Sequence, residues 1–301
     1  MEAFQDDLEE LYKWQSENNM IFNGTKFEIL RYGNNEDLKN TCNYLTPNAE
    51  EIIERKELLK DLGIKMNDKA DFTDHVNFVI TKVKQRAGWI LRSFRRRNPD
   101  FMKHMWKTYM QGHIDYCSQL WQPLQSGMLQ RIENLQKSFT KKIPHISHLN
   151  YWERLSYLRI NSQQRRLERY RIIYVWKSLE GLSPNCGIIS DENDKRGRMC
   201  KLPAIVQSAS QHIKTLREQT LQVHGCKLFN KMPAEIRNLK HCGVEDFKIK
   251  LDQFLSQIPD QPVIGSLLPT TCDPITMKPS NSILDWASTL GRDLRRNPGG
   301  G

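Results

Sequence analysis

Basic side chains in the middle of the chain have the spacing that most clearly predicts chemistry. Several recur four residues apart, as Lys82 and Arg86 do. Because residues at this spacing share one face of a helix, they form a row of positive charge that a phosphate backbone can neutralise. The predicted nucleic-acid-binding residues are Lys82, Lys84, Arg86, Arg92, Arg95, Arg96, Arg97, Lys141, Lys142, Arg165, Arg166 and Arg169.

The positive charge is concentrated in one third of the chain. Residues 81–180 hold 20 Lys and Arg against 6 Asp and Glu, a local net charge of +14, whereas the whole chain carries +10 and the remainder therefore −4. A polyanion is the natural partner of such a segment, because neutralised phosphates release their counterions. Solvated helix faces would explain scattered charges of both signs better than this excess. Nothing in the pattern indicates base-specific recognition.

Paired carboxylates near the start of the chain suggest a second kind of chemistry. Phe4-Gln5-Asp6-Asp7 has the order in which polymerases present two aspartates to metal ions. That arrangement requires a tight turn between apolar strands, whereas here Leu8, Leu11 and Trp14 continue a helical pattern. Acidic residues also favour the first turn of a helix. We therefore interpret this stretch as a helix start and predict no catalytic residue in the chain.

Other catalytic and metal-binding motifs are missing from the sequence. It contains no G-x-S-x-G, H-E-x-x-H, Walker or Rossmann pattern. None of the 7 cysteines forms a Cys-x-x-Cys pair, and the spacings of His224 with Cys226 and of His241 with Cys242 are too short for the usual zinc pairs. We expect reduced thiols, no metal site and no cofactor.

Aromatic residues interleave with the basic ones. They can stack on bases, but aromatic side chains at helical spacing more often belong to a core, which is the interpretation we favour. These residues are Trp89, Trp106, Tyr109, Tyr116, Trp121, Tyr151 and Trp152.

Hydropathy predicts neither insertion into a membrane nor secretion. No stretch approaches the roughly 18 to 20 apolar residues that span a bilayer, and the first residues are acidic and helix-like, unlike a signal peptide. The expected location is intracellular, either nuclear or cytoplasmic.

The clearest predicted element is one long helix that would position the first basic residues. Apolar residues from Val76 to Phe94 recur at helical spacing, and Asn98-Pro99-Asp100 ends this helix and caps the next. Loop-like composition at 181–198 suggests a domain boundary. The other expected helices cover about 4–14, 126–142, 150–159, 161–180, 221–230, 244–257 and 283–290, and short strands are expected at 20–22, 27–30, 44–45 and within 58–66.

The order of several short motifs resembles one known family. In chain order these motifs are Leu8, Leu11, Trp14, Asn19, Met20, Phe22, Asn23 and Lys26, then Lys60-Asp61-Leu62-Gly63-Ile64, then Tyr109, Ile114-Asp115-Tyr116-Cys117, Trp121 and Pro123, then Tyr151, Glu153-Arg154-Leu155 and Arg165-Arg166, and finally Leu228-Phe229-Asn230, Met232-Pro233 and Phe247-Lys248. Over about residues 5–258 this order is similar to the palm end, thumb and post-thumb region of LINE-type non-LTR retrotransposon reverse transcriptases of the jockey and CR1 kind. Gly112-His113 departs from the basic or proline-containing pair expected there.

The resemblance implies a mainly α fold. It divides the chain into a small α+β palm remnant over 1–70, a basic helical thumb-like domain over 71–182, a loop-rich mixed or helical region over 183–258 and a weakly ordered tail over 259–301. In the family the thumb grips the template and primer duplex, and the palm aspartates belong to segments upstream of those that match.

The expected function is accordingly that of a truncated member of the RNA-directed DNA polymerase family. It would not be an enzyme by itself, would need Mg²⁺ only if a complete palm were present, and would bind RNA or an RNA/DNA duplex independently of sequence. Two alternatives remain open: an inert or host-adopted helical module with an acidic protein partner, and the C-terminal part of an active polymerase with a wrongly assigned start.

Overall fold

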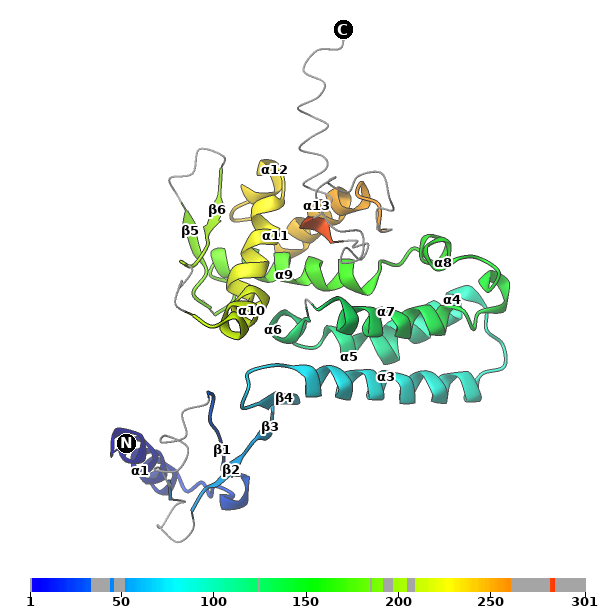
Figure 1. The fold of residues 1–301 in the computed structure, drawn as a ribbon. Helices are drawn as coiled ribbons and strands as arrows, with labels where there is room; N and C mark the ends of the chain where they lie inside the picture. Colours follow the sequence, from blue (N-terminus) through cyan, green and yellow to red (C-terminus); the bar gives the residue numbers. More distant parts are fainter. Residues whose placement is uncertain are drawn as a thin grey trace. The chain divides into compact units, whose positions relative to one another are not determined.

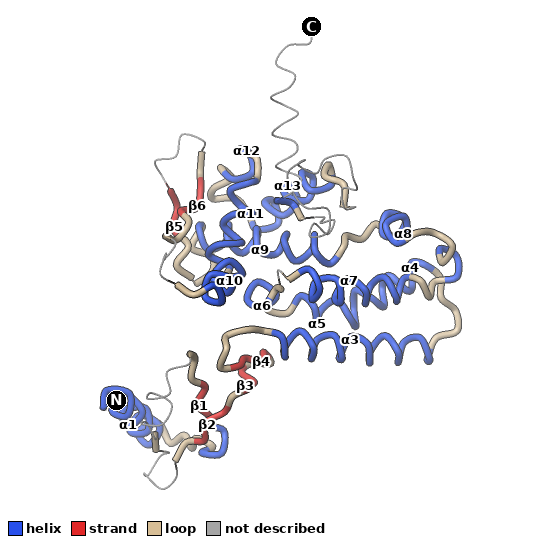
Figure 2. The backbone as a smooth tube through the Cα atoms, in the orientation of Figure 1, coloured by secondary structure: helices blue, strands red, loops and turns tan. Residues whose placement is uncertain are grey.

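The computed structural model describes residues 2–33, 44–45, 52–123, 125–184, 186–191, 197–204, 209–260 and 282–284. The chain forms two compact units, Met1–Asn77 and Phe78–Gly301. Helices dominate the described residues, as Figure 2 shows, so the predicted mainly α fold is confirmed. Within the described parts, no helix combines the length and the apolar character needed to cross a bilayer.

The first unit combines one amphipathic helix with short strands. Its elements are α1 (Glu2–Glu17), the 3₁₀ turn η1 (Gly24–Lys26), β1 (Glu28–Leu30), β2 (Glu54–Lys56), β3 (Leu58–Asp61) and β4 (Ile64–Asn67). Strands β1 and β2 pair in parallel, and β3 and β4 form an antiparallel hairpin. Leu62 and Gly63 at the hairpin tip both have positive φ, which suits the right-handed twist of a two-residue turn. The predicted helix start at Phe4-Gln5-Asp6-Asp7 is confirmed.

The strand predictions for this unit are only partly confirmed. The expected strands at 27–30 and within 58–66 correspond to β1 and to the β3–β4 hairpin. Leu45 forms an isolated bridge with Ile52, and residues 20–22 form no strand. Tyr12, Phe22 and Phe27 instead pack edge to face, which places Phe22 among aromatic rings and not in a sheet.

Helix α3 (Thr73–Ser93) confirms the long helix expected from Val76 to Phe94. Its apolar stripe is buried, with Val83 and Ile90 completely covered. The next helix begins where the sequence predicted, because the Asn98 side chain accepts a hydrogen bond from the amide of Phe101, 2.8 Å away, and Pro99 occupies the first turn.

The remaining helices of the second unit follow α3 along the chain (Figure 1). They are α4 (Pro99–Met105), the π-helical turn η3 (Trp106–Gln111), α5 (Gly112–Asp115), α6 (Ser118–Trp121), α7 (Ser126–Thr140), the 3₁₀ turn η4 (Pro144–Ile146), α8 (Tyr151–Leu158) and α9 (Gln163–Leu179), then α10 (Gln211–Gln219), the π-helical turn η5 (Leu221–Gly225), α11 (Cys226–Lys231), α12 (Ala234–Arg237) and α13 (Val244–Ser256). A short antiparallel pair, β5 (Ile189–Asp191) and β6 (Met199–Lys201), lies between α9 and α10 in the chain. Helix α10 was not expected from the sequence, and of the helix expected at 283–290 only 283–284 are described.

Helix α9 is the centre of the second unit. It packs against α6, α7, α11 and α13, and it shares one apolar core with the last two. Within that core Trp176 stacks on Phe247 of α13, with ring centroids 4.3 Å apart. The boundary expected after residue 182 therefore falls inside this unit, whose core joins residues on both sides of it. The weakly ordered tail expected over 259–301 lies mostly outside the described residues.

Candidate nucleic-acid interface

Helix α3 and the turn after it present half of the twelve predicted basic residues to solvent. Lys82, Lys84, Arg86, Arg92, Arg95 and Arg96 are all exposed. None of these six forms an ion pair with a carboxylate that the structure describes. Arg97 differs, because its guanidinium donates to the carbonyls of Leu91 (2.7 Å) and Phe94 and so closes the C-terminus of the helix. The six exposed cations together form the α3 surface.

Aromatic side chains lie beside part of the α3 surface. Trp89 is 46% exposed and meets Tyr109 of η3 edge to face, with ring centroids 6.0 Å apart. His113 lies near them, and burial together with the positive charges of Arg86 and Lys82 lowers the pKa of its imidazole. The favoured interpretation of the aromatic residues as core is thus right for Trp106, Trp121 and Tyr151 and wrong for Trp89, Tyr109 and Tyr116, which are exposed.

Lys141 and Lys142 extend from the end of α7 and are exposed. The ammonium of Lys141 donates to the carbonyl of Ser147, 2.7 Å away, across the turn that follows. Lys142 has no such partner among the described residues. Both side chains remain accessible to a phosphate.

The arginines of α9 lie in a different environment. Arg165 is 1% exposed, and its guanidinium donates to the carbonyls of Leu255, Ile258 and Pro259 and faces Asp260. Its charge therefore ties α9 to the end of α13, and it has no accessible surface for a phosphate. Arg165 therefore does not belong to the candidate interface.

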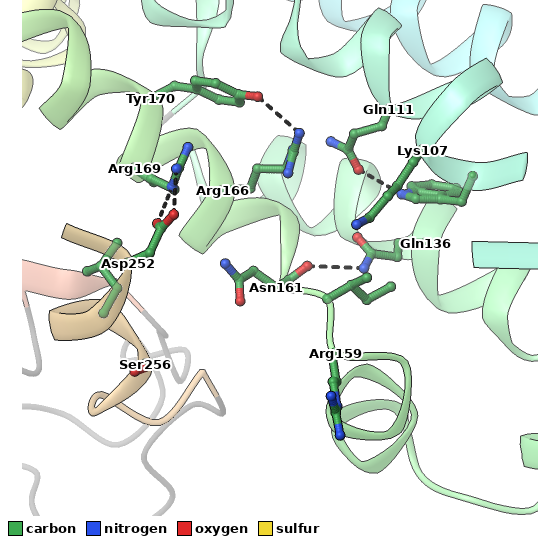
Figure 3. Close-up of a pocket in the computed structure, with 13 residues that line it drawn as sticks. Lys107, Gln111, Gln136, Arg159, Asn161, Arg166, Arg169, Tyr170, Asp252 and Ser256 are labelled. Carbon is green, nitrogen blue, oxygen red and sulfur yellow. Dashed lines mark hydrogen bonds and ion pairs between the residues drawn. The ribbon is translucent and has the colours of Figure 1, made fainter. Parts of the chain in front are cut away.

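Arg166 and Arg169 are half-buried and each is held by a carboxylate. Arg166 donates through Nε and Nη2 to Asp115, at 3.0 and 2.7 Å. Burial acts to lower the pKa of Arg166, but the hydrogen bond and charge of Asp115 outweigh it and raise that pKa. Arg169 donates to the carboxylate of Asp252 on α13 through its own Nε and Nη2. Both side chains line a pocket with Lys107 and Arg159, which were not among the twelve predicted residues (Figure 3).

The acidic residues of the basic region are mostly withdrawn from the surface. Of residues 81–180 the structure describes all except Leu124. Glu133 and Glu168 are buried, Asp115 pairs with Arg166 and Glu180 with Arg198. Only Asp100 and Glu153 are exposed. Twelve basic residues are exposed: Lys82, Lys84, Arg86, Arg92, Arg95, Arg96, Lys107, Arg131, Lys137, Lys141, Lys142 and Arg159.

Glu133 is one of the carboxylates that are withdrawn from the surface. It accepts hydrogen bonds from the hydroxyl of Tyr151 and from the backbone amides of Gln163 and Gln164, and thereby caps α9 from α7. Burial raises its pKa to about 7 against the opposing effect of these donors. The carboxylate of Glu133 thus holds α7 and α9 together and does not offset the positive charge of the exposed basic residues.

Among the described residues, no group of three or more His, Cys, Asp or Glu is arranged to hold a metal ion. Asp6 and Asp7 are exposed neighbours on α1. Adjacent residues of a helix project in different directions, so this pair does not form the chelating arrangement of a polymerase.

Comparisons with known proteins add a limited likeness. No family model matches the chain. The chain is similar to the uncharacterized protein B0403.1 of Caenorhabditis elegans, with 20% identity over 127 residues, which is 41% of this chain and 62% of that protein. No solved structure matches. The name of the nematode protein states no activity.

Proposed function

We propose that the second unit binds nucleic acid through its backbone phosphates, without preference for sequence, and that the α3 surface makes the main contacts. The observation that carries this proposal is the contrast of twelve exposed basic residues with two exposed acidic ones over residues 81–180. Phosphate neutralisation by such side chains releases counterions and supplies most of the affinity in non-specific binding.

The arrangement of the α3 surface supports contact with a strand. Lys82 and Arg86 lie one helical turn apart, and Trp89 follows on the same face of the helix. An exposed indole therefore lies next to two cations along α3. Phosphates would meet the ammonium and guanidinium groups, while an unpaired base would stack on the indole. Lys141 and Lys142 supply further positive charge from α7.

We further propose that the chain corresponds to the palm end, thumb and post-thumb region of a LINE-type reverse transcriptase and has no polymerase activity by itself. The ordered motifs from Leu8 to Phe247 and the basic helical unit support this assignment. The exposed, divergent Asp6 and Asp7 on α1 support the absence of a catalytic pair. Its partner would then be RNA or an RNA/DNA hybrid.

The test is binding of the 301-residue protein to a labelled RNA/DNA hybrid at constant salt. The α3 variant changes Lys82, Arg86, Arg92 and Arg96 to Gln. The control variant changes four exposed lysines outside the basic region to Gln, namely Lys201, Lys231, Lys240 and Lys250. Both remove four charges, so they differ only in where the charges lay.

We expect the α3 variant to bind about tenfold more weakly or worse, and the control variant to remain much closer to the unmodified protein. Equal losses in both variants would mean that net charge, not the α3 surface, determines binding. Binding to an acidic protein that nucleic acid fails to displace would instead favour a protein-interaction module.

A further inference from the structure

A pocket of about 380 Å³ opens in the second unit beside α9. Its walls come from η3, α7, the connection between α8 and α9, α9 itself and α13. Four basic side chains line it, Lys107, Arg159, Arg166 and Arg169, against one carboxylate, Asp252. The lining therefore has a formal charge of +3. Figure 3 shows Lys107, Arg166 and Asn161 around the same opening, with Arg159 at its lower edge.

The two arginines from α9 are fixed in place before any ligand arrives. Asp115 holds Arg166, which also donates to the hydroxyl of Tyr170 at 3.0 Å, and Asp252 holds Arg169. In both pairs the arginine donates through Nε and Nη2. The Nη1 atoms of Arg166 and Arg169 have no hydrogen-bond partner among the described residues. A guanidinium held by two hydrogen bonds loses little conformational entropy when it makes a third.

The other two cations have no carboxylate partner. Neither Lys107 nor Arg159 forms an ion pair with a described residue. Burial, followed by the positive charges of Lys103 and Arg166, lowers the pKa of Lys107. An anion inside the pocket would offset this repulsion between like charges and stabilise the ammonium form.

The side-chain amide of Asn161 adds an uncharged donor to the wall of the pocket. The backbone carbonyl of Asn161 accepts a hydrogen bond from Nε2 of Gln136, 3.1 Å away, which anchors the connection between α8 and α9. The side-chain amide of Asn161 has no described partner and lines the pocket. A ligand here would therefore meet several N–H donors and only one carboxylate.

We infer that this pocket binds a phosphate monoester, the terminal phosphoryl group of a nucleotide or of a nucleic-acid strand. A monoester has close to two negative charges and three oxygens that accept hydrogen bonds, which matches a +3 lining of guanidinium, ammonium and amide donors. A pocket of about 380 Å³ also has room for the attached sugar. The α3 surface plays no part in this site, so the inference and the proposed function can fail separately.

The experiment measures binding of AMP and adenosine to the full chain by calorimetry at constant ionic strength. The test variant changes Lys107 and Arg159 to Gln, because both are exposed and neither supports a described ion pair. The control variant changes Lys231 and Lys240 to Gln, since these exposed lysines lie outside both the pocket and the basic region. Oligonucleotides of four nucleotides, with and without a 5′-phosphate, distinguish a strand end from a free nucleotide.

We expect AMP to bind and adenosine not to, with affinity for AMP or for the 5′-phosphorylated strand about tenfold weaker in the test variant and unchanged in the control. The ligand with the higher affinity identifies the source of the phosphate. Three results would overturn the inference: equal binding of AMP and adenosine, equal loss in both variants, or no binding of any phosphorylated probe at millimolar concentration.

Discussion

Helices α3 and α9 are both rich in arginine and lysine, yet they use the charge in opposite ways. The cations of α3 are exposed, whereas Arg165 and Arg171 of α9 are completely buried. Helix α3 buries one apolar stripe and leaves its other sides to solvent, while α9 is surrounded by α6, α7, α11 and α13. The position of a helix in the bundle thus decides whether its arginines face solvent or hold the fold together.

The largest effect expected from this difference concerns Arg165. Changing Arg165 to Gln removes the donor to three carbonyls near the end of α13 and leaves Asp260 without the cation it faces. The free energy of unfolding should fall by about 3 to 5 kcal/mol, as it does when one partner of a buried charged group is lost. Denaturant unfolding followed by circular dichroism measures it. A loss below about 1 kcal/mol, with weaker nucleic-acid binding, would place Arg165 in the interface after all.

Buried Arg171 of α9 faces a histidine whose protonation makes stability depend on pH. Its Nη1 lies 2.9 Å from Nδ1 of His224, and burial followed by the charge of Arg171 lowers the pKa of His224 to about 3. Between that pH and the ordinary value near 6.5 the unfolded chain takes up a proton that the folded protein refuses, so stability falls as the pH drops.

The measurement compares the unfolding free energy at pH 7 and pH 4 with that of a His224→Gln variant. The unmodified protein should lose up to about 3 kcal/mol more than the variant over this range. Parallel pH profiles of the two proteins would show that His224 is not held neutral by its surroundings.

A smaller effect tests the aromatic part of the interface. Trp89 is half-exposed and meets Tyr109 edge to face, so a change to Ala should lower stability by less than the loss of a buried tryptophan would, and it should weaken binding of single-stranded RNA by about 1 to 3 kcal/mol through lost stacking. Binding of a fully paired hybrid should change less. The matched control is Tyr157→Ala on α8, where the ring is 60% exposed and distant in sequence from α3. Equal effects of the two variants would argue against stacking at Trp89.

The smallest effect concerns Arg169, the α9 arginine whose partner is most exposed. Asp252 is 49% exposed in its side chain, so solvent screens the pair. A double-mutant cycle with Arg169→Gln and Asp252→Asn should give a coupling energy of less than about 1 kcal/mol in unfolding experiments. A coupling energy as large as the stability loss expected for Arg165→Gln would mean that solvent exposure does not distinguish Arg169 from the buried arginine.

Local sequence patterns predicted the elements whose causes are local. The apolar spacing of α3 and the Asn98 cap depend on residues within one or two turns, and both of them form. The exposed cations of α3 also follow from its periodicity, because the polar side of an amphipathic helix faces water.

The environment of α9 depends on contacts that sequence spacing does not contain. Arg165 meets carbonyls some 90 residues later in the chain, and the pocket gathers side chains from five separate segments. The pattern of α9 shows apolar and basic residues together, which is compatible with either an exposed or a central helix. The same limit explains why the helical spacing of Trp89 and Tyr109 predicts a core position for residues that are exposed.

The most direct test of the account is the salt dependence of hybrid binding by the unmodified protein and by the variant with Lys82, Arg86, Arg92 and Arg96 changed to Gln. Each phosphate contact contributes about 0.9 to the slope of log affinity against log salt, so removing four should reduce that slope by about 3 to 4. A slope that is steep in the unmodified protein and reduced by this amount would establish α3 as the phosphate-binding surface. A slope unchanged by the four substitutions would contradict it.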